Sequence, residues 1–414
     1  MQQHVQAHHE DLLIPSLTYD KDFTASYIES CRLVRFRPSA GDRYSPSART
    51  IRFSLQDHCW LEPSSVRLQF QLNNLTGQPL VPVAHPLAMF QSLKLYAGGQ
   101  LCENIEEAGP LATILDKLKP YVRRLNDSMM NHPLSNSDGA ADARENLAAN
   151  QSRRVLFELP LGVFKSQKML PLHLLSGLTV ELTLGDAAQA FDTTNPPNWD
   201  ISDVSMLASC LHVNSTISAQ YNTHLSQGLT LPIAFTSVVG TSHISNNNSF
   251  TLSLARSLTH LKQLYFVIVS TAADKKIVKD FEINVGGMNL DLQRDAVTWQ
   301  VQVGSHRYPD FPAQGAAETF YRLTQAAGVA SGNGDIAITP AKFVAGSAVY
   351  AIDFEKMGEQ AAFTGINTQG QVMTLTVSNA WPNDDATARR IFCYQVYDSI
   401  LNIRGFAGGV DIVD

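Results

Sequence analysis

The stretch that decides the fold class is Ser65-Val66-Arg67-Leu68-Gln69-Phe70-Gln71-Leu72, in which apolar and polar residues alternate without a break. Alternation with a period of two places the apolar side chains on one face of a β-strand and the polar ones on the other. The same alternation returns in Leu178-Thr179-Val180-Glu181-Leu182-Thr183-Leu184 and in Met373-Thr374-Leu375-Thr376-Val377. The pattern therefore predicts a mainly β protein.

Other segments extend this strand pattern. Thr251-Leu252-Ser253-Leu254 alternates again, and Leu264-Tyr265-Phe266-Val267-Ile268-Val269 is continuously apolar, as is typical of a strand covered on both faces. Leu93 and Leu95 precede Gly98-Gly99, a residue pair typical of hairpin turns.

Few helices are expected. The first is predicted near residues 110–118, between Gly109-Pro110 and Pro120, because its apolar residues lie at i, i+3, i+4 and i+7. Those residues are Leu111, Ile114, Leu115 and Leu118. A second helix is predicted over residues 315–323, ahead of Gly328.

These features recur in the same order in both halves of the chain. In the first half, a strand ending at Gly98-Gly99 leads to the helix near 110–118 and then to the strand at 178–184. In the second, a predicted strand from Phe281 to Gly287 leads to the second helix and then to the strand at 373–377. The offset of roughly 190–205 residues is the size of a domain.

The length also favours two domains, because 414 residues exceed what one small core requires. We expect an N-terminal arm at residues 1–45, a first unit at 46–222 and a second unit at 223–414. The boundary is placed in the polar stretch 218–228.

Charge and composition exclude several classes of protein. Apolar residues make up 44% and charged residues 17%, an ordinary globular balance. The net charge is -7, and the basic pairs Arg123-Arg124, Arg153-Arg154 and Arg389-Arg390 are interpreted as solvated charges. We therefore predict no direct sequence-specific binding of nucleic acid. No apolar run is long enough for a transmembrane helix, and the first residues do not resemble a secretory signal.

The cysteines do not form a recognisable metal or redox motif. The chain contains five, at positions 31, 59, 102, 210 and 393, without a CxxC pair. Burial as small apolar side chains in a reducing compartment is the interpretation we favour. Pairing of four of them stays open for a particle that matures outside the cell.

Candidate catalytic patterns are weak. Two of the imidazoles of His4, His8 and His9 could lie one helical turn apart, at metal-ligand spacing. The arm offers no third ligand, so adventitious binding is the better interpretation. The adjacent carboxylates Glu106-Glu107 and Asp384-Asp385 point to different sides of any regular element. We predict that the chain is not an enzyme and has no catalytic, cofactor-binding or metal-binding residues.

The order of these segments resembles a known family. The run Ile51-Arg52-Phe53-Ser54-Leu55, then Trp60-Leu61-Glu62-Pro63 and the strand at 65–72, resembles the opening of double jelly-roll major capsid proteins. The likeness is to those of eukaryotic DNA viruses in the adintovirus, polinton-like virus and virophage lineage. Further segments are similar to that family at 82–93, 157–161, 168–178, 352–355, 363–368 and 397–403.

The resemblance covers residues 28–414 and implies the fold and the role. It implies two tandem eight-stranded jelly-roll sandwiches with a few short helices in loops, and a homotrimer that tiles an icosahedral shell. Penton or vertex proteins and minor capsid proteins would be partners, and the chain would lie in the virion after assembly inside the host cell. The first helix and the loops 185–200 and 328–346 would lie at subunit contacts or on the outer surface. Short loops argue against elaborate outer towers.

Alternatives remain at this point. A carbohydrate-binding or glycan-processing β-sandwich protein would require clustered aromatic or carboxylate residues, whereas the four tryptophans are widely spaced. A single-jelly-roll coat protein of a small RNA virus would require a basic arm. A capsid-like protein from an integrated element would have the same sequence features, and contact with an inner membrane is open.

Overall fold

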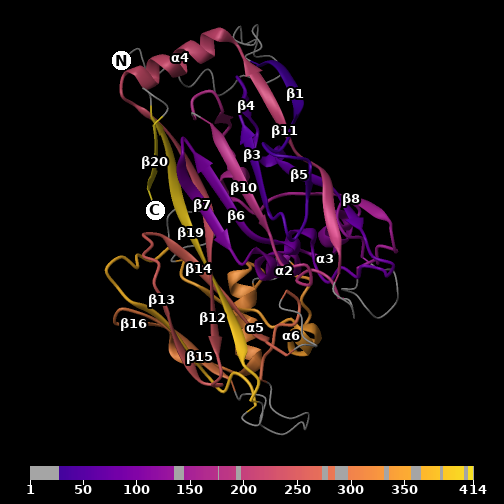
Figure 1. Ribbon diagram of the computed structural model, residues 1–414. Helices are drawn as coiled ribbons and strands as arrows, with labels where there is room; N and C mark the ends of the chain where they lie inside the picture. Colours follow the sequence, from indigo (N-terminus) through magenta and orange to yellow (C-terminus); the bar gives the residue numbers. More distant parts are fainter. Residues whose placement is uncertain are drawn as a thin grey trace, which may run out of the picture.

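The strands form four sheets, two from each half of the chain (Figure 1). The computed structural model describes residues 28–134, 144–175, 177–192, 197–272, 278–284, 297–330, 335–355, 365–382, 386–404 and 409–413. In this part of the chain, none of the helices combines the length and the apolar character that a membrane crossing requires.

The elements of the first half are mostly strands. The strands are β1 (Ile28–Phe36), β2 (Arg43–Tyr44), β3 (Thr50–Leu55), β4 (Trp60–Leu61), β5 (Arg67–Asn74), β6 (Phe90–Ala97), β7 (Gln100–Glu106), β8 (Ser152–Phe157), β9 (Leu170–Pro171), β10 (Leu178–Leu184) and β11 (Trp199–Val213). The helices are η3 (Pro63–Ser65), η4 (Pro86–Met89), α2 (Ala108–Leu118), α3 (Tyr121–Ser128) and η5 (Gly162–Lys165).

Helix α4 (Ser215–Ser226) leads into the second half. Its strands are β12 (Thr230–Ser245), β13 (Phe250–Leu254), β14 (Leu261–Ser270), β15 (Thr298–Val303), β16 (His306–Gln314), β17 (Tyr350–Asp353), β18 (Met373–Ser378), β19 (Arg389–Arg404) and β20 (Val410–Val413). Its helices are α5 (Gly315–Ala326) and α6 (Pro340–Gly346).

The two halves have the same strand order. One pair of sheets runs β3-β10-β6-β7 and β13-β18-β15-β16, and the other contains β1-β11-β5-β8 and β12-β19-β14-β17. Within each set of four, the strands lie in the order first, fourth, second, third along the chain. Two facing four-stranded layers with this order make a jelly roll, so the predicted all-β double jelly roll is confirmed.

Burial follows the predicted alternation. All four leucine and valine side chains at alternate positions of β10 are buried, and the threonine and glutamate side chains between them are not. The inner faces meet across each sandwich: the rings of Phe70 and Phe90 lie 6.2 Å apart in the first, and those of Phe266 and Trp299 lie 5.4 Å apart in the second. Each half therefore has its own aromatic core between two sheets.

Both predicted helices are present. Helix α2 follows the hairpin β6–β7, and α5 follows the hairpin β15–β16, so the repeat is structural as well as sequential. The continuously apolar segment is β14, which is buried from Leu264 to Ser270. The carbonyl of Ala326 in α5 accepts hydrogen bonds from Gln263 and Tyr265 of this strand. The second covered face of β14 thus lies under α5.

Several local predictions were wrong. Residues 281–284 form only isolated bridges at Phe281, and residues 285–287 lie outside the described residues. The counterpart of β6 is β15, because the hairpin that precedes α5 begins there. The loop predicted at 328–346 contains α6, whose N-cap Thr339 accepts a hydrogen bond from the Lys342 amide.

The ends of the first unit also carry more structure than the sequence suggested. Residues 28–36, which we placed in the arm, form β1 and pair with β11, and Arg43–Tyr44 forms β2. The stretch chosen as the boundary lies mostly in α4, which Asn214 caps by accepting a hydrogen bond from the Thr216 amide.

Candidate functional site

A buried polar contact between the halves is centred on Glu103 of β7. This carboxylate is buried and accepts hydrogen bonds from the amides of Gly162 and Val163, at 2.8 and 2.9 Å. The hydroxyl of Ser237, in β12 of the second half, donates to it at 2.7 Å. Burial raises the pKa of Glu103, and these three hydrogen bonds act in the opposite direction. One side chain thereby joins both sandwiches.

Two glycines let the backbones of the halves touch. A Cβ atom at Gly162 would lie 1.9 Å from the carbonyl oxygen of Thr236, and one at Gly240 would lie 2.2 Å from that of Glu106. Neither glycine has a positive φ, so the requirement is steric contact and not backbone conformation. Any larger residue would push β12 away from the first half.

A second polar cluster lies at the start of α2. The Glu107 carboxylate accepts hydrogen bonds from Arg390 at 2.5 Å and from Ser242 at 3.1 Å. The Tyr394 hydroxyl donates to the Glu107 carbonyl at 2.7 Å. Glu107 adopts a left-handed backbone conformation with φ 53°. Its carboxylate and carbonyl are both held by β12 and β19.

Helix α2 also contacts the second half at its other end, where Figure 1 shows it at the junction of the two halves. The ammonium group of Lys117 is buried, donates to the Ser347 hydroxyl at 2.7 Å and lies 5.0 Å from the centre of the Phe281 ring. The carbonyls of Lys117 and Lys119 accept from the Ala337 amide. Contacts at both ends of α2 fix the orientation of one sandwich against the other.

A buried ion cluster joins α2 to α3. Asp116 accepts from Arg124 at 2.8 Å and from Arg144 at 2.6 Å, and all three side chains are buried. Burial by itself would raise the pKa of Asp116, but the two guanidinium groups lower it. Two arginines predicted to be solvated are therefore structural: Arg124 in this cluster and the buried Arg389, which donates to Glu282 at 2.7 Å.

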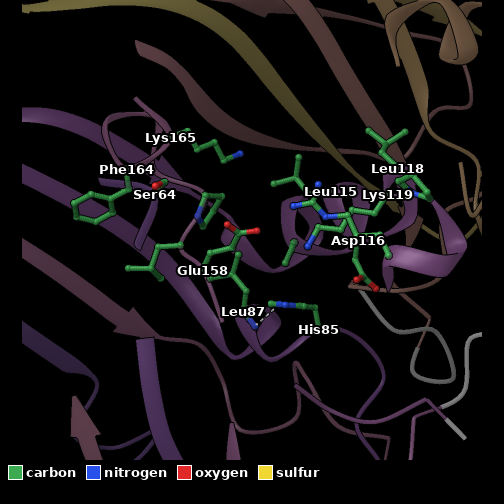
Figure 2. Close-up of a pocket in the computed structure, with 15 residues that line it drawn as sticks. Ser64, His85, Leu87, Leu115, Asp116, Leu118, Lys119, Glu158, Phe164 and Lys165 are labelled. Carbon is green, nitrogen blue, oxygen red and sulfur yellow. Dashed lines mark hydrogen bonds between the residues drawn. The ribbon is translucent and has the colours of Figure 1, made fainter. Parts of the chain in front are cut away.

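A cavity of about 550 Å³ lies beside this cluster, and Figure 2 shows His85, Asp116, Lys119 and Glu158 around it. Burial lowers the pKa of His85 to about 3, and its Nδ1 accepts from the Leu87 amide. An imidazole with so low a pKa is a poor general base, and Asp116 is neutralised by arginine. Both side chains take part in contacts that hold the fold: His85 with the Leu87 amide, and Asp116 with two arginines.

An exposed apolar stripe runs along α3. Val122 and Leu125 of α3 and its C-cap residue Met129 lie at i, i+3 and i+7, with 67%, 42% and 86% of their surfaces exposed. Three large apolar residues on one helix face are more than the isolated exposed residues that a surface normally carries. This α3 stripe is the strongest candidate on the described chain for contact with another molecule.

The residues that the sequence offered as metal-ligating or catalytic candidates do not form one site in the described part of the chain. His4, His8 and His9 lie outside the described residues, as do Asp384 and Asp385. Glu106 is exposed, whereas Glu107 is paired with Arg390. Among the cysteines, Cys31 is exposed and the other four are buried, and none of the five forms a disulfide. No local pattern pointed to Glu103, because a single glutamate in a strand is ordinarily solvated.

The tryptophans do not form one aromatic surface. Trp199 packs on Phe191, Trp299 on Phe266 and Trp381 on Phe250, in separate parts of the two cores. Trp60 contacts Tyr221 and His173.

The sequence matches no protein-family model and no curated protein. The fold, however, is similar to that of solved capsid structures. The PBCV-1 virus capsid subunit is 13% identical, with a TM-score of 0.61 over 96% of this chain and 100% of that one. A chain of the Sputnik virophage is 13% identical, with a TM-score of 0.59 over 97% and 92%. The mavirus major capsid protein is 12% identical, with a TM-score of 0.52 over 98% and 94%. The chain shares the double jelly-roll fold of these proteins along nearly its whole length.

Proposed function

We propose that this chain is the structural major capsid protein of a virus with an icosahedral shell, and that it has no enzymatic role. The observation that carries the proposal is the full-length likeness to capsid subunits in both sandwiches at once, since it covers 96% of this chain and 100% of the PBCV-1 subunit. A shared single jelly roll would mean little, because that architecture serves many functions.

The junction between the halves supports this role. Two sandwiches held at one fixed orientation make a block with two similar lobes, and three such blocks around an axis give a trimer with a nearly hexagonal outline. Hexagonal units tile flat facets. The Glu103 hydrogen bonds and the close approach at Gly162 and Gly240 hold the lobes in that orientation.

The domain limits are part of the proposal. We place the first jelly roll at residues 46–222 and the second at 223–414, with 1–45 as an arm whose strands β1 and β2 complete the β11 sheet of the first sandwich. The pairing of β1 with β11 supports an arm whose last part adds to the first sandwich. Helix α4 serves as the connection between the two units.

The α3 stripe is our candidate for the contact between chains in the trimer. Capsid subunits associate with copies of themselves, and homo-oligomer contacts bury apolar residues of this kind. Trimers would then pack into a lattice, closed by penton or vertex proteins and supported by minor capsid proteins.

Location and genome contact follow from the same role. The chain would lie in the virion after assembly inside the host cell. With a net charge of -7 and only scattered basic pairs, it would not coat the genome by neutralising phosphates, so packaging would depend on other components. The carbohydrate-binding alternative receives no support from the described tryptophans, which are dispersed.

Light scattering and negative-stain electron microscopy on the purified chain test the proposal. We expect a mass of about three chains of 45.4 kDa and a hexagonal outline, or closed shells. A monomer that persists at high concentration across salt and pH contradicts it.

A matched pair of variants tests the α3 stripe separately. Met129→Glu should shift the mass towards the monomer, whereas Ile244→Glu, at a similarly exposed residue of β12, should not. If both variants remain trimeric, the trimer contact lies elsewhere on the chain.

A further inference from the structure

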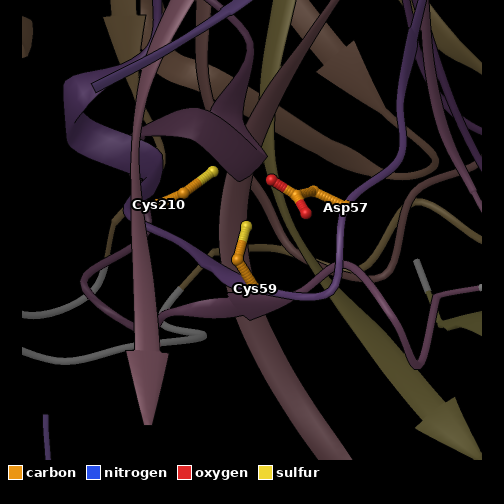
Figure 3. A group of neighbouring side chains, drawn as sticks. All are labelled: Asp57, Cys59 and Cys210. Atoms are coloured by element: carbon orange, nitrogen blue, oxygen red, sulfur yellow. The ribbon is translucent and has the colours of Figure 1, made fainter. Parts of the chain in front are cut away.

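Three potential metal ligands from distant parts of the sequence meet beside strand β11 of the first sandwich. Asp57 and Cys59 lie just before β4, and Cys210 lies in β11. The strands β4 and β11 are paired, with Cys210 opposite Leu61, which brings Cys59 beside Cys210. The two sulfur atoms and a carboxylate oxygen lie within 4.8 Å of one another, and Figure 3 shows all three side chains pointing to a common centre.

The spacing suits a small tetrahedral ion. With zinc–sulfur bonds of about 2.3 Å and a zinc–oxygen bond of about 2.0 Å, tetrahedral geometry separates the ligand atoms by roughly 3.5–3.8 Å. Because no pair of these atoms is more than 4.8 Å apart, they need to close by at most about 1 Å, within the reach of side-chain rotation. Thiolate ligands favour zinc over calcium or magnesium, which bind oxygen.

Charge at the site is consistent with a bound dication. Two thiolates and one carboxylate around Zn²⁺ leave a net charge of -1. Arg32 in β1 lies opposite Cys210 in the strand register, so a cation is at hand to offset it. Cys59 and Cys210 are themselves buried, whereas Asp57 is partly exposed, so water can reach the site from the carboxylate side.

We propose that Asp57, Cys59 and Cys210 form a zinc site, with water as the fourth ligand, that joins the segment before β4 to the central strand β11. Zinc binding displaces the two thiol protons to solvent, and no oxidation step is involved. The site would fasten the segment before β4 to the same stretch of β11 with which β1, the continuation of the N-terminal arm, pairs.

Titration of the reduced, chelator-treated full chain with Co²⁺ is the direct test, since cobalt bound by thiolates absorbs in the near ultraviolet. We expect one Co²⁺ per chain, a thiolate charge-transfer band, and loss of that band when Zn²⁺ is added. Zn²⁺ should also raise the midpoint of thermal unfolding. Absence of the band in the wild-type chain overturns the proposal.

Variants assign the ligands. Cys210→Ser should abolish the band, and Asp57→Asn, a milder change at a partly exposed residue, should weaken Co²⁺ binding at least about tenfold. Cys393→Ser is the matched control, because it removes a buried thiol from the second half and should leave the titration unchanged. Retention of the band in the Cys210 variant, or an intact mass and alkylation pattern showing a Cys59–Cys210 disulfide in the chain purified without reductant and metal, overturns the zinc assignment.

Discussion

Replacing Gly162 by alanine should separate the two sandwiches more than the same replacement at any other glycine of the described residues. The added Cβ would lie 1.9 Å from the Thr236 carbonyl oxygen, a backbone atom that cannot rotate away. Real Cβ contacts stay beyond 3.0 Å, so η5 and β12 must move apart by at least about 1 Å. The same movement disturbs the hydrogen bonds of Gly162 and Ser237 to Glu103.

The size of the effect follows from these two losses. Overpacking a rigid contact costs about 1–3 kcal/mol. Weakening one charge-assisted hydrogen bond of a buried carboxylate adds about 1.5–3 kcal/mol. We therefore expect Gly162→Ala to lower the free energy of unfolding by roughly 3–5 kcal/mol, with part of that relieved if the halves separate.

Gly77→Ala is the matched control, because no atom lies within 4 Å of its added Cβ and its φ is not in the strained region. Both variants would be compared with the wild type by urea denaturation and by electron microscopy of the assembled chain. We expect Gly162→Ala to unfold at lower urea and to lose the hexagonal outline, and Gly77→Ala to do neither. Equal stability of the two variants would refute the reasoning about the junction.

Three further predictions concern buried polar groups. Burial lowers the pKa of His85 to about 3, so between about pH 6.5 and pH 3 only the unfolded chain takes up this proton, and stability falls as the pH falls. Between pH 6.5 and pH 5 the loss is about 2 kcal/mol; His85→Asn should remove it in denaturation experiments at the two pH values, and His306→Asn, on the surface, should not. Arg144→Met leaves Asp116 with one buried cation fewer and should lower the free energy of unfolding, measured by urea denaturation, by about 3–5 kcal/mol. A decrease below about 1 kcal/mol would contradict the stabilising role of the buried cluster. Tyr394→Phe removes the hydroxyl that donates to the carbonyl at the start of α2 and should cost about 1 kcal/mol, and an unchanged urea midpoint would show that this bond contributes nothing.

Regular local patterns in the sequence predicted individual strands and helices. Strand β10 alternates because one face meets the core, and β14 is continuously apolar because the sheet lies on one face and α5 on the other. Helix α4 was missed because most of its residues are polar, and the short helix α3 was missed although Val122, Leu125 and Met129 recur at helical spacing.

Contacts between residues distant in sequence could not be predicted. Glu103 and Ser237 are separated by 134 positions and Glu107 and Arg390 by 283, and no local pattern connects them. Arg124 and Arg389 looked like solvated charges because a basic pair in sequence carries no information about the carboxylate it meets.

By itself, the sequence determined the β class, the positions of the main strands and the order that repeats in both halves, because periodicity and turn residues act within a few positions of each other. Only the tertiary structure decided which strands are neighbours in each sheet, how the two sandwiches touch at Gly162 and Gly240, and which thiols lie beside Asp57. The physical reason is that strand pairing and side-chain packing depend on long-range contacts, whose free energy is gained only when the whole chain folds.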